Sequence, residues 1–69
     1  MWRGEATAAI RSFLPRFVRR TEESYDYATA TITVKLWGDL TQQDAEEALA
    51  QATWWLPVGI HVKVEVGAL

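Results

Sequence analysis

Apolar side chains near the start of the chain recur every three or four residues, the spacing that gathers them on one face of a helix. This spacing predicts an amphipathic helix within residues 1–20. Pro15 interrupts the pattern, because proline lacks a backbone N–H and crowds the carbonyl of Arg11. The helix is expected either to end near Leu14, with a short turn after it, or to continue with a kink to about Arg20. Its apolar positions are Trp2, Ala6, Ala9, Ile10, Phe13, Leu14 and Phe17.

Residues 25–37 alternate between two faces, which is the pattern of a half-buried strand. Ile32, Val34 and Leu36 share one face with two alanines, whereas threonine, tyrosine, lysine and tryptophan side chains occupy the other. Threonine, tyrosine and branched aliphatic residues favour a pleated surface. The pattern predicts one long amphipathic strand that ends at Gly38.

A second helix is predicted over residues 41–56. Thr41 is a candidate N-cap, whose hydroxyl can accept the backbone N–H of Asp44, and Asp44 imitates the glutamate of a capping box. Pro57 stops the helix. Alanine dominates the expected inward stripe, so this helix can approach a sheet closely. The stripe is Ala45, Ala48, Leu49, Ala52, Trp55 and Leu56.

Residues 60–66 follow the turn that Gly59 allows and alternate between aliphatic and polar side chains, which predicts a second amphipathic strand. The elements therefore follow the order α-β-α-β and define one small α+β domain over residues 1–69. If both strands join one sheet, the strand, helix and strand form a right-handed βαβ unit with parallel strands. The first helix is expected to cover the same face of the sheet as the second helix, or the opposite face.

The long strand lacks a partner over its first half. Thirteen residues of strand span about 43 Å and seven span about 23 Å, so residues 25–30 have no neighbour within this topology. Their backbone N–H and C=O groups need a partner or must face water. We therefore expect another chain to complete the sheet. The alternatives are a long strand that bends over a compact monomer, and an N-terminal segment that folds back to pair.

The composition supports the expectation of a partner. The chain has 69 residues, no cysteine and a single histidine, so it forms no disulfide and no multi-histidine metal site. Domains of this size usually depend on disulfides, a metal or a second chain for their stability. We expect protein partners, in a homo-oligomer or a larger assembly.

Aromatic side chains indicate where such a partner docks, because interface cores are enriched in them. Tyr25, Tyr27 and Trp37 share the polar face of the long strand, unless the first helix covers that face in a three-layer sandwich. Trp54 and Trp55 are adjacent, so Trp55 fits the inward stripe while Trp54 points outward, either to a partner or folded over the following turn. The candidate interface residues are Trp2, Phe13, Phe17, Tyr25, Tyr27, Trp37 and Trp54.

Basic residues are concentrated at the start of a chain whose net charge is −2. Residues 1–20 hold five arginines against one acidic residue, Glu5. These arginines are candidate contacts for a nucleic-acid phosphate or an anionic membrane surface. The acidic remainder of the chain repels phosphate, and the arginines can instead form ion pairs with it. The candidate anion contacts are Arg11, Arg16, Arg19 and Arg20.

No residue pattern points to catalysis. His61 and Glu65 share a strand face but lie about 13 Å apart, so His61 is interpreted as a surface or interface histidine. Ser12 and Ser24 have no obvious base, and no P-loop, dinucleotide-binding or HExxH motif is present. We expect no enzyme activity, no catalytic residue, no cofactor and no metal.

The chain also has no predicted targeting segment. No apolar run approaches the length of a membrane-spanning helix. Arg11 and Pro15 interrupt the apolar segment that a signal peptide would need. We expect a protein of the cytoplasm or of a virion.

Residues 31–66 resemble a βαβ module of bacteriophage tail and baseplate proteins, in which a strand, a helix, a proline turn and a strand of alternating valines follow one another. The resemblance covers about half the chain and implies a non-enzymatic building block of a tail, a baseplate or a similar contractile assembly. It carries no active-site residues. The matching residues are Ile32, Thr33, Val34, Ala45, Leu49, Ala52, Leu56, Pro57, Val58, Gly59, Ile60, His61 and Val62.

The expected function is therefore that of a structural or assembly subunit. It would bind other protein chains by pairing at a strand edge and by docking of an apolar helix. The alternative is a small nucleic-acid-binding or antitoxin-like regulatory protein that uses the basic segment of residues 1–20.

Overall fold

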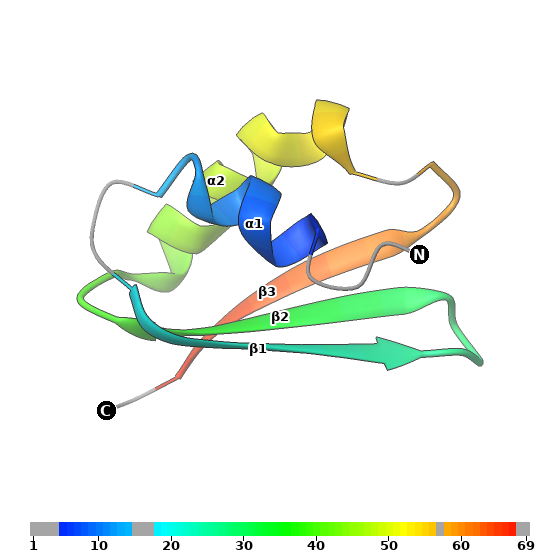
Figure 1. Ribbon diagram of the computed structural model, residues 1–69, viewed down its shortest axis with the longest axis horizontal. Helices are drawn as coiled ribbons and strands as arrows, with labels where there is room; N and C mark the ends of the chain where they lie inside the picture. Colours follow the sequence, from blue (N-terminus) through cyan, green and yellow to red (C-terminus); the bar gives the residue numbers. More distant parts are fainter. Residues whose placement is uncertain (1–4, 15–17, 57, 68–69) are drawn as a thin grey trace.

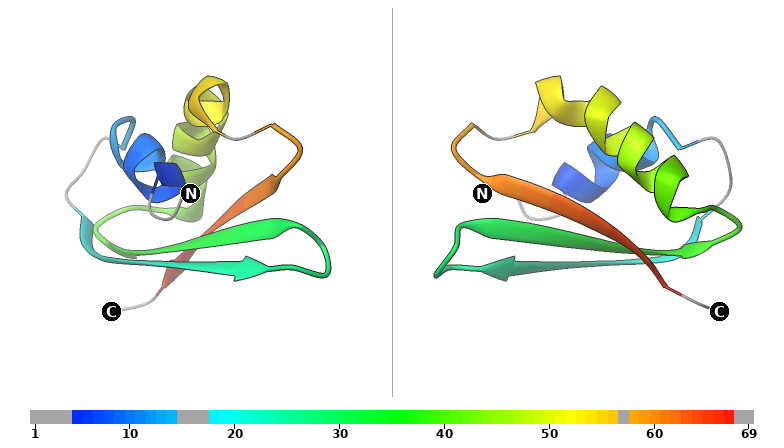
Figure 2. Two further views of the ribbon diagram at one scale, coloured as in Figure 1. Left: turned by 45° about the vertical axis from the view of Figure 1, so that its right-hand side comes forward. Right: turned by 180° about the vertical axis from the view of Figure 1, so that it is seen from behind.

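A computed structural model of the chain describes residues 5–14, 18–56 and 58–67. Three strands form one mixed sheet in the order β1-β2-β3, in which β1 is antiparallel to β2 and β2 is parallel to β3. Two helices lie side by side over one face of this sheet (Figures 1 and 2), so the fold has two layers. The elements are α1 (Glu5–Arg11), β1 (Val18–Asp26), β2 (Thr31–Gly38), α2 (Gln42–Ala52), the 3₁₀-helix η1 (Thr53–Trp55) and β3 (His61–Gly67).

The second half of the chain matches the sequence prediction, since β2, α2 and β3 form a βαβ unit with parallel strands. Thr41 caps α2 as expected: its hydroxyl accepts the backbone N–H of Asp44 at 3.1 Å. The Asp44 carboxylate in turn accepts the backbone N–H of Thr41 at 3.0 Å, which completes the capping box. The α+β class is therefore confirmed.

The first half differs from the prediction. The first helix ends at Arg11, close to the earlier of its two predicted ends, near Leu14, and a turn follows it. The alternative of a kinked helix that continues to about Arg20 is wrong, because the chain already belongs to β1 from Val18. The single strand expected over residues 25–37 is two antiparallel strands joined by a turn at residues 27–30. The element order is therefore α-β-β-α-β, ignoring η1, rather than α-β-α-β.

The turn of this hairpin explains why the pattern was misleading. Residues 27–30 contain no glycine, proline or asparagine, and they continue the alternation of the flanking strand. The reversal depends instead on the Asp26 carboxylate, which accepts the backbone N–H of Ala28 at 2.9 Å. Ala30 adopts a left-handed conformation with φ of 51°, which is uncommon for a residue with a Cβ.

The hairpin also removes the reason for placing another chain beside residues 25–30. Tyr25 pairs with Ile32 and Asp26 pairs with Thr31. Residues 27–30 are turn residues and need no strand neighbour. The predicted long strand therefore folds back on itself, and among the described residues no N-terminal segment pairs with residues 25–30.

The core lies between the sheet and the two helices. Its largest fully buried side chains are Ile10 from α1 and three residues of β2. The buried face of α2 consists of alanines, so the helix backbone comes close to the sheet, as the sequence predicted. The buried residues of the core are Ala6, Ile10, Val18, Ile32, Val34, Leu36, Ala45, Ala48, Ala52 and Val64.

Hydrogen bonds to the Glu23 carboxylate of β1 fix the start of α1 to the sheet. The backbone N–H and the hydroxyl of Thr7 both donate to the Glu23 carboxylate, at 3.1 and 2.6 Å. The first N–H groups of a helix have no partner within the helix. Glu23, from β1, therefore supplies from a distant part of the chain the acceptor that an N-cap residue usually provides.

Replacing Glu23 by alanine is expected to lower the free energy of unfolding by about 1.5 kcal/mol, because buried Thr7 loses a charged acceptor. The measurement is a urea unfolding curve followed by circular dichroism. The matched control is Glu22→Ala, because Glu22 is exposed on the same strand and its ion pair with Arg20 lies at the surface. Equal effects of the two substitutions would contradict a specific role for Glu23.

The free edge of β3 is partly covered by the first residue of α2. The Gln42 side-chain amide donates to the carbonyl of Val64 at 2.8 Å. Its carbonyl oxygen accepts the backbone N–H of Val66 at 3.0 Å. One side chain thus makes the two hydrogen bonds that a neighbouring strand would make at this position.

Candidate protein-binding surface

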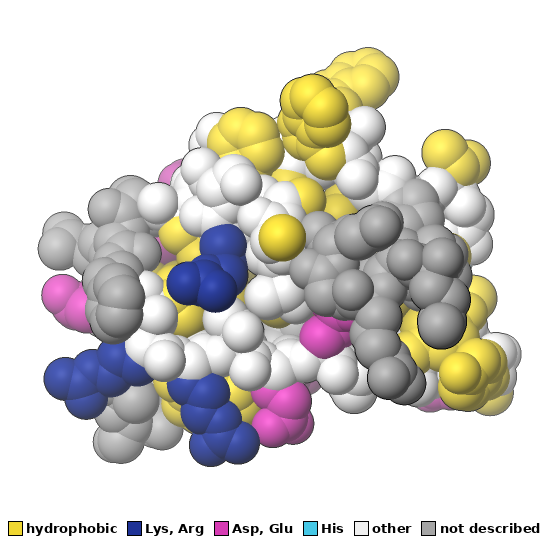
Figure 3. All heavy atoms as spheres, viewed as in Figure 1, with side chains coloured by type: hydrophobic (Ala, Val, Ile, Leu, Met, Phe, Trp, Pro, Cys, Tyr) yellow, Lys and Arg dark blue, Asp and Glu magenta, His cyan; other side chains and the backbone are white. Residues whose placement is uncertain are grey.

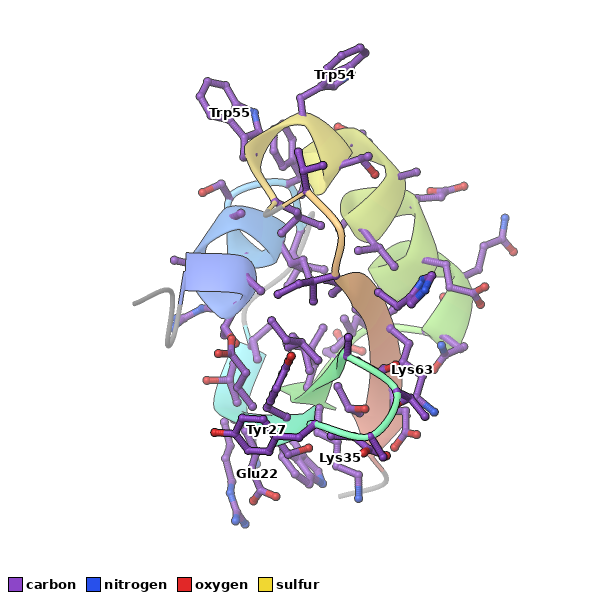
Figure 4. The ribbon with its side chains drawn as sticks, turned by 90° about the vertical axis from the view of Figure 1, so that its right-hand side faces the viewer. Glu22, Tyr27, Lys35, Trp54, Trp55 and Lys63 are labelled. Atoms are coloured by element: carbon purple, nitrogen blue, oxygen red, sulfur yellow. The ribbon has the colours of Figure 1, made fainter. Side chains whose placement is uncertain are left out.

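Large apolar side chains are exposed at the end of α2. Trp54 is 91% exposed, Trp55 is 73% exposed and Val58 is fully exposed. Both indoles point away from the body of the molecule, on the side of the helices that faces away from the sheet (Figure 4). We call these three residues the tryptophan patch. Hydrophobic side chains gather at the same end in the space-filling view (Figure 3).

A groove adjoins this patch. It has a volume of about 540 Å³ and runs between the end of α1 and η1. Trp55 forms one wall, and residues at and just after the end of α1 form the other. The Ser12 hydroxyl, which belongs to this lining, donates to the carbonyl of Ala8 at 3.0 Å. We call this the α1–η1 groove, and its lining residues are Ala8, Ala9, Ser12, Phe13 and Trp55.

The exposure of Trp55 contradicts its expected place in the inward stripe of α2. The other members of the stripe do pack on the core: Ala52 is fully buried, and Leu56 beyond Trp55 is half-buried against it. Along its length α2 rises away from the sheet, so that η1 lies farthest from the strands (Figures 1 and 2). Trp55 therefore has α1 beside it and no strand beneath it. Trp54 points outward, as the sequence predicted.

The other predicted interface residues are separated by the fold. Phe13 is half-buried against the core and also lines the groove. Tyr27 is 87% exposed, but it lies in the hairpin turn, far from the tryptophan patch (Figure 4). Trp2 and Phe17 lie outside the described residues.

Tyr25 was expected to share the outer face of the sheet with Tyr27 and Trp37. Instead it packs against the core, because the antiparallel register places it opposite buried Ile32. Its ring meets that of Tyr27 edge to face, with 4.5 Å between the centroids. Tyr25 is thus partly buried against the core of the same chain.

Trp37 does lie on the face of the sheet away from the helices, which we call the open face. Its indole lies across Gly67 of β3, where no side chain separates them. The Arg20 guanidinium lies 4.7 Å from the ring centroid, and the Lys35 ammonium 5.9 Å from it. Trp37 is half-buried by its own chain, so it offers less apolar surface than the sequence indicated.

The rest of the open face is polar. Glu22, Lys35 and Glu65 are all exposed and form one row across the three strands, in which the sign of the charge alternates. Cross-strand neighbours of opposite charge stabilise a sheet surface that is in contact with water. No helix of the described residues covers this face (Figure 4), so the three-layer arrangement is not formed by them.

Replacing Gly67 by alanine is expected to push the Trp37 indole off the sheet. The added Cβ would lie 2.6 Å from two of its ring atoms, so the ring must rotate into water. The loss of ring burial and of the Arg20 contact should cost about 1 kcal/mol. The measurement combines urea unfolding with the NMR signal of the Trp37 indole N–H.

A matched control for this prediction is Gly59→Ala. A Cβ at Gly59 would meet no atom within 4 Å, but the residue has φ of 85°. This substitution should cost a similar amount through backbone strain and leave the Trp37 signal unchanged. An unchanged Trp37 signal in Gly67→Ala would contradict the prediction.

The candidate anion contacts are partly engaged within the chain. The Arg20 guanidinium forms an ion pair with Glu22 at 3.3 Å as well as stacking on Trp37. Arg11 ends α1, and Arg19 lies where the pairing of β1 with β2 is irregular; both are exposed. Arg16 lies outside the described residues.

His61 lies exposed on the open face with Lys63 and Glu65, as expected from the strand pattern. A hollow of about 400 Å³ lies beside His61, near the hairpin turn. Among residues 5–14, 18–56 and 58–67, no three histidine or acidic side chains are placed to hold a metal ion. None of the helices in these ranges is long and apolar enough to cross a membrane.

Sequence reasoning identified one residue of the tryptophan patch and one of the α1–η1 groove, namely Trp54 and Phe13. It missed the small residues of α1 that form the groove wall, and it placed Trp55 in the core. A signal was present in the sequence: two adjacent tryptophans on one helix cannot both face the same core. Comparisons of the chain with family models, curated proteins and solved structures found no match.

Proposed function

We propose that this chain is a non-enzymatic assembly subunit that binds other protein chains through the tryptophan patch and the α1–η1 groove. The observation that carries the proposal is the exposure of Trp54 and Trp55 on neighbouring positions of η1. Burying an indole removes about 150–250 Å² of mostly apolar surface from water. Tryptophan is also enriched among the residues that contribute most to binding energy at interfaces.

The shape of the surface supports docking of a protruding apolar side chain or helix. Ala8, Ala9 and Ser12 are small, so a partner can approach the backbone of α1 closely. The described residues that form the patch and the groove lining are uncharged, which lowers the cost of removing water from them. An uncharged centre is typical of an interface core.

Pairing at a strand edge, the other binding mode expected from the sequence, has less support at β3. Gln42 already bonds the backbone of Val64 and Val66 at that edge. An incoming strand would have to displace this side chain. We therefore propose docking at the tryptophan patch as the main mode of binding.

The resemblance of residues 31–66 to modules of bacteriophage tail and baseplate proteins suggests a setting for such a subunit. These residues form β2, α2, η1 and most of β3, and so include Trp54 and Trp55. We propose a tail, a baseplate or a similar contractile assembly as this setting. Detection of the chain in purified particles of that kind would support it, and its absence from them would contradict it.

The binding proposal is tested by copurification from the native source with an affinity-tagged chain. The wild type should recover a partner protein in a fixed ratio, and the double variant Trp54→Ala/Trp55→Ala should lose it. Tyr27→Ala is the control, because Tyr27 is equally exposed at a distant site. Circular dichroism should show all three proteins folded. Retention of the partner by the double variant would contradict the proposed surface.

The nucleic-acid alternative makes a different prediction. It expects binding that weakens steeply with salt and is lost when Arg16, Arg19 and Arg20 are replaced by glutamine. The proposal expects the arginine variant to keep its protein partner and the wild type to bind no DNA or RNA in physiological salt. Tight binding of nucleic acid under that condition would favour the alternative.

A further inference from the structure

The tryptophan patch and the α1–η1 groove are parts of one continuous surface. Trp54 protrudes from η1 (Figure 4), and the next residue, Trp55, forms a wall of the groove. One surface therefore offers both a protruding side chain and a hollow. When two copies are related by a two-fold axis, the protruding side chain of each copy meets the hollow of the other. A surface that offers both shapes can therefore complement itself.

We propose that the chain pairs with a second copy of itself about a two-fold axis, with Trp54 of each copy entering the α1–η1 groove of the other. The inference rests on the proposed function and names one partner for the same surface. The groove has a volume of about 540 Å³ and is open to solvent, so the indole of a second copy would lie against its walls with part of the ring still exposed.

The absence of charge among the residues that form this surface favours a second copy. A charged surface that meets its own copy brings like charges together, which costs binding energy. The tryptophan patch and the groove lining contain only alanine, serine, valine and aromatic residues. Two copies can therefore bring these described residues together without placing like charges against each other. The open face, in contrast, presents rows of charge to water.

The available apolar area agrees with a modest dimer. At 91% and 73% exposure, Trp54 and Trp55 contribute on the order of 250–400 Å² per copy. A standard stable interface buries about 800 Å² per partner. The two indoles thus supply between a third and a half of that area, and the groove walls add to it.

Sedimentation equilibrium of the purified chain tests the inference. The wild type should dimerise with concentration, and Trp54→Ala should weaken the dimer at least about 30-fold, the loss expected for an interface hot spot. Ala8→Glu, which places a carboxylate on the exposed wall of the groove, should weaken it similarly. Tyr27→Ala is the control and should leave the dimer unchanged, because Tyr27 lies in the distant hairpin turn.

Mixing the two weakened variants gives the sharpest test. Trp54→Ala keeps its groove and Ala8→Glu keeps its tryptophan, so the mixed pair recovers one intact contact. The mixed dimer should therefore form at lower concentration than either variant alone. A mixed dimer no tighter than the parents would overturn the pairing of Trp54 with the groove.

Two other outcomes would overturn the second-copy inference. One is a wild type that stays monomeric at about 100 μM, a concentration well above the dissociation constant of a micromolar dimer. The other is growth into open chains, which a head-to-tail contact would give. Neither outcome decides the proposed function, because copurification of a different protein through Trp54 and Trp55 is measured separately.

Discussion

Replacing Ile10 by alanine is expected to lower the free energy of unfolding by about 2–5 kcal/mol, the range for removing a fully buried aliphatic side chain. Ile10 has no exposed surface and is among the largest fully buried side chains of the core. It belongs to a helix of only seven residues, and helices shorter than about 12 residues are marginal without tertiary contacts. The loss should therefore release α1 and also remove one wall of the α1–η1 groove.

Urea unfolding followed by circular dichroism measures this loss. Val58→Ala is the control, because Val58 is fully exposed and its truncation should leave stability unchanged. If α1 is released first, the dependence on urea should also become shallower, since less surface remains to be exposed in the main transition. A loss below about 1 kcal/mol would show that α1 is not anchored through Ile10.

Replacing Ala48 by leucine is expected to cost about 1–3 kcal/mol, in this case through overpacking. Ala48 is 1% exposed, and its neighbours on the buried face of α2 are also alanines. The backbone of α2 therefore lies close to the sheet, with no space for a larger side chain. Leucine would force α2 away from β3, on which this helix packs, although leucine is one of the strongest helix formers.

The control for this prediction is Ala50→Leu, which makes the same chemical change on the exposed side of the same helix. It should change stability by no more than about 0.5 kcal/mol. Thermal unfolding of the two variants, compared with the wild type, separates packing from helix propensity. Equal stability of Ala48→Leu and Ala50→Leu would contradict close packing of α2 on the sheet.

The βαβ half of the fold could be predicted because its signals are local. Thr41 and Asp44 mark the start of α2 by a contact three residues apart, and residues 60–66 alternate without interruption. Alanines at helical spacing identify the buried face of α2. Each of these features acts within a few residues along the chain, so none depends on how the rest of the chain folds.

The hairpin half could not be predicted in the same way. In the antiparallel register Tyr25 lies opposite Ile32, so an odd-numbered residue of β1 shares a face with an even-numbered residue of β2. The turn therefore reverses which positions face the core, and an alternation that continues through the turn assigns Tyr25 to the wrong face. Only the Asp26 carboxylate and the left-handed Ala30 mark the reversal, and both are weak signals in a sequence.

The candidate surface was predictable only in part, because its exposure depends on contacts between distant segments of the chain. Helix geometry alone places Trp54 and Trp55 about 100° apart, which makes one of them a candidate for exposure. The tilt of α2 and the position of α1 beside η1 decide that both are exposed. The position of α1 depends on the packing of Ile10 and on the Thr7–Glu23 contact, which join segments that are far apart in the sequence.

The Gln42 side chain has a consequence for the order in which the fold forms. Its two hydrogen bonds join residues 22 and 24 positions apart, whereas the hairpin closes over the four residues of its turn. Because the entropy lost on closing a loop rises with its length, the hairpin is expected to form first, on a timescale of about 1–10 μs. Docking of β3 and bonding of Gln42 then occur together. The transition state should contain the β1–β2 pair, with the contacts of Val64 and Val66 formed late in folding.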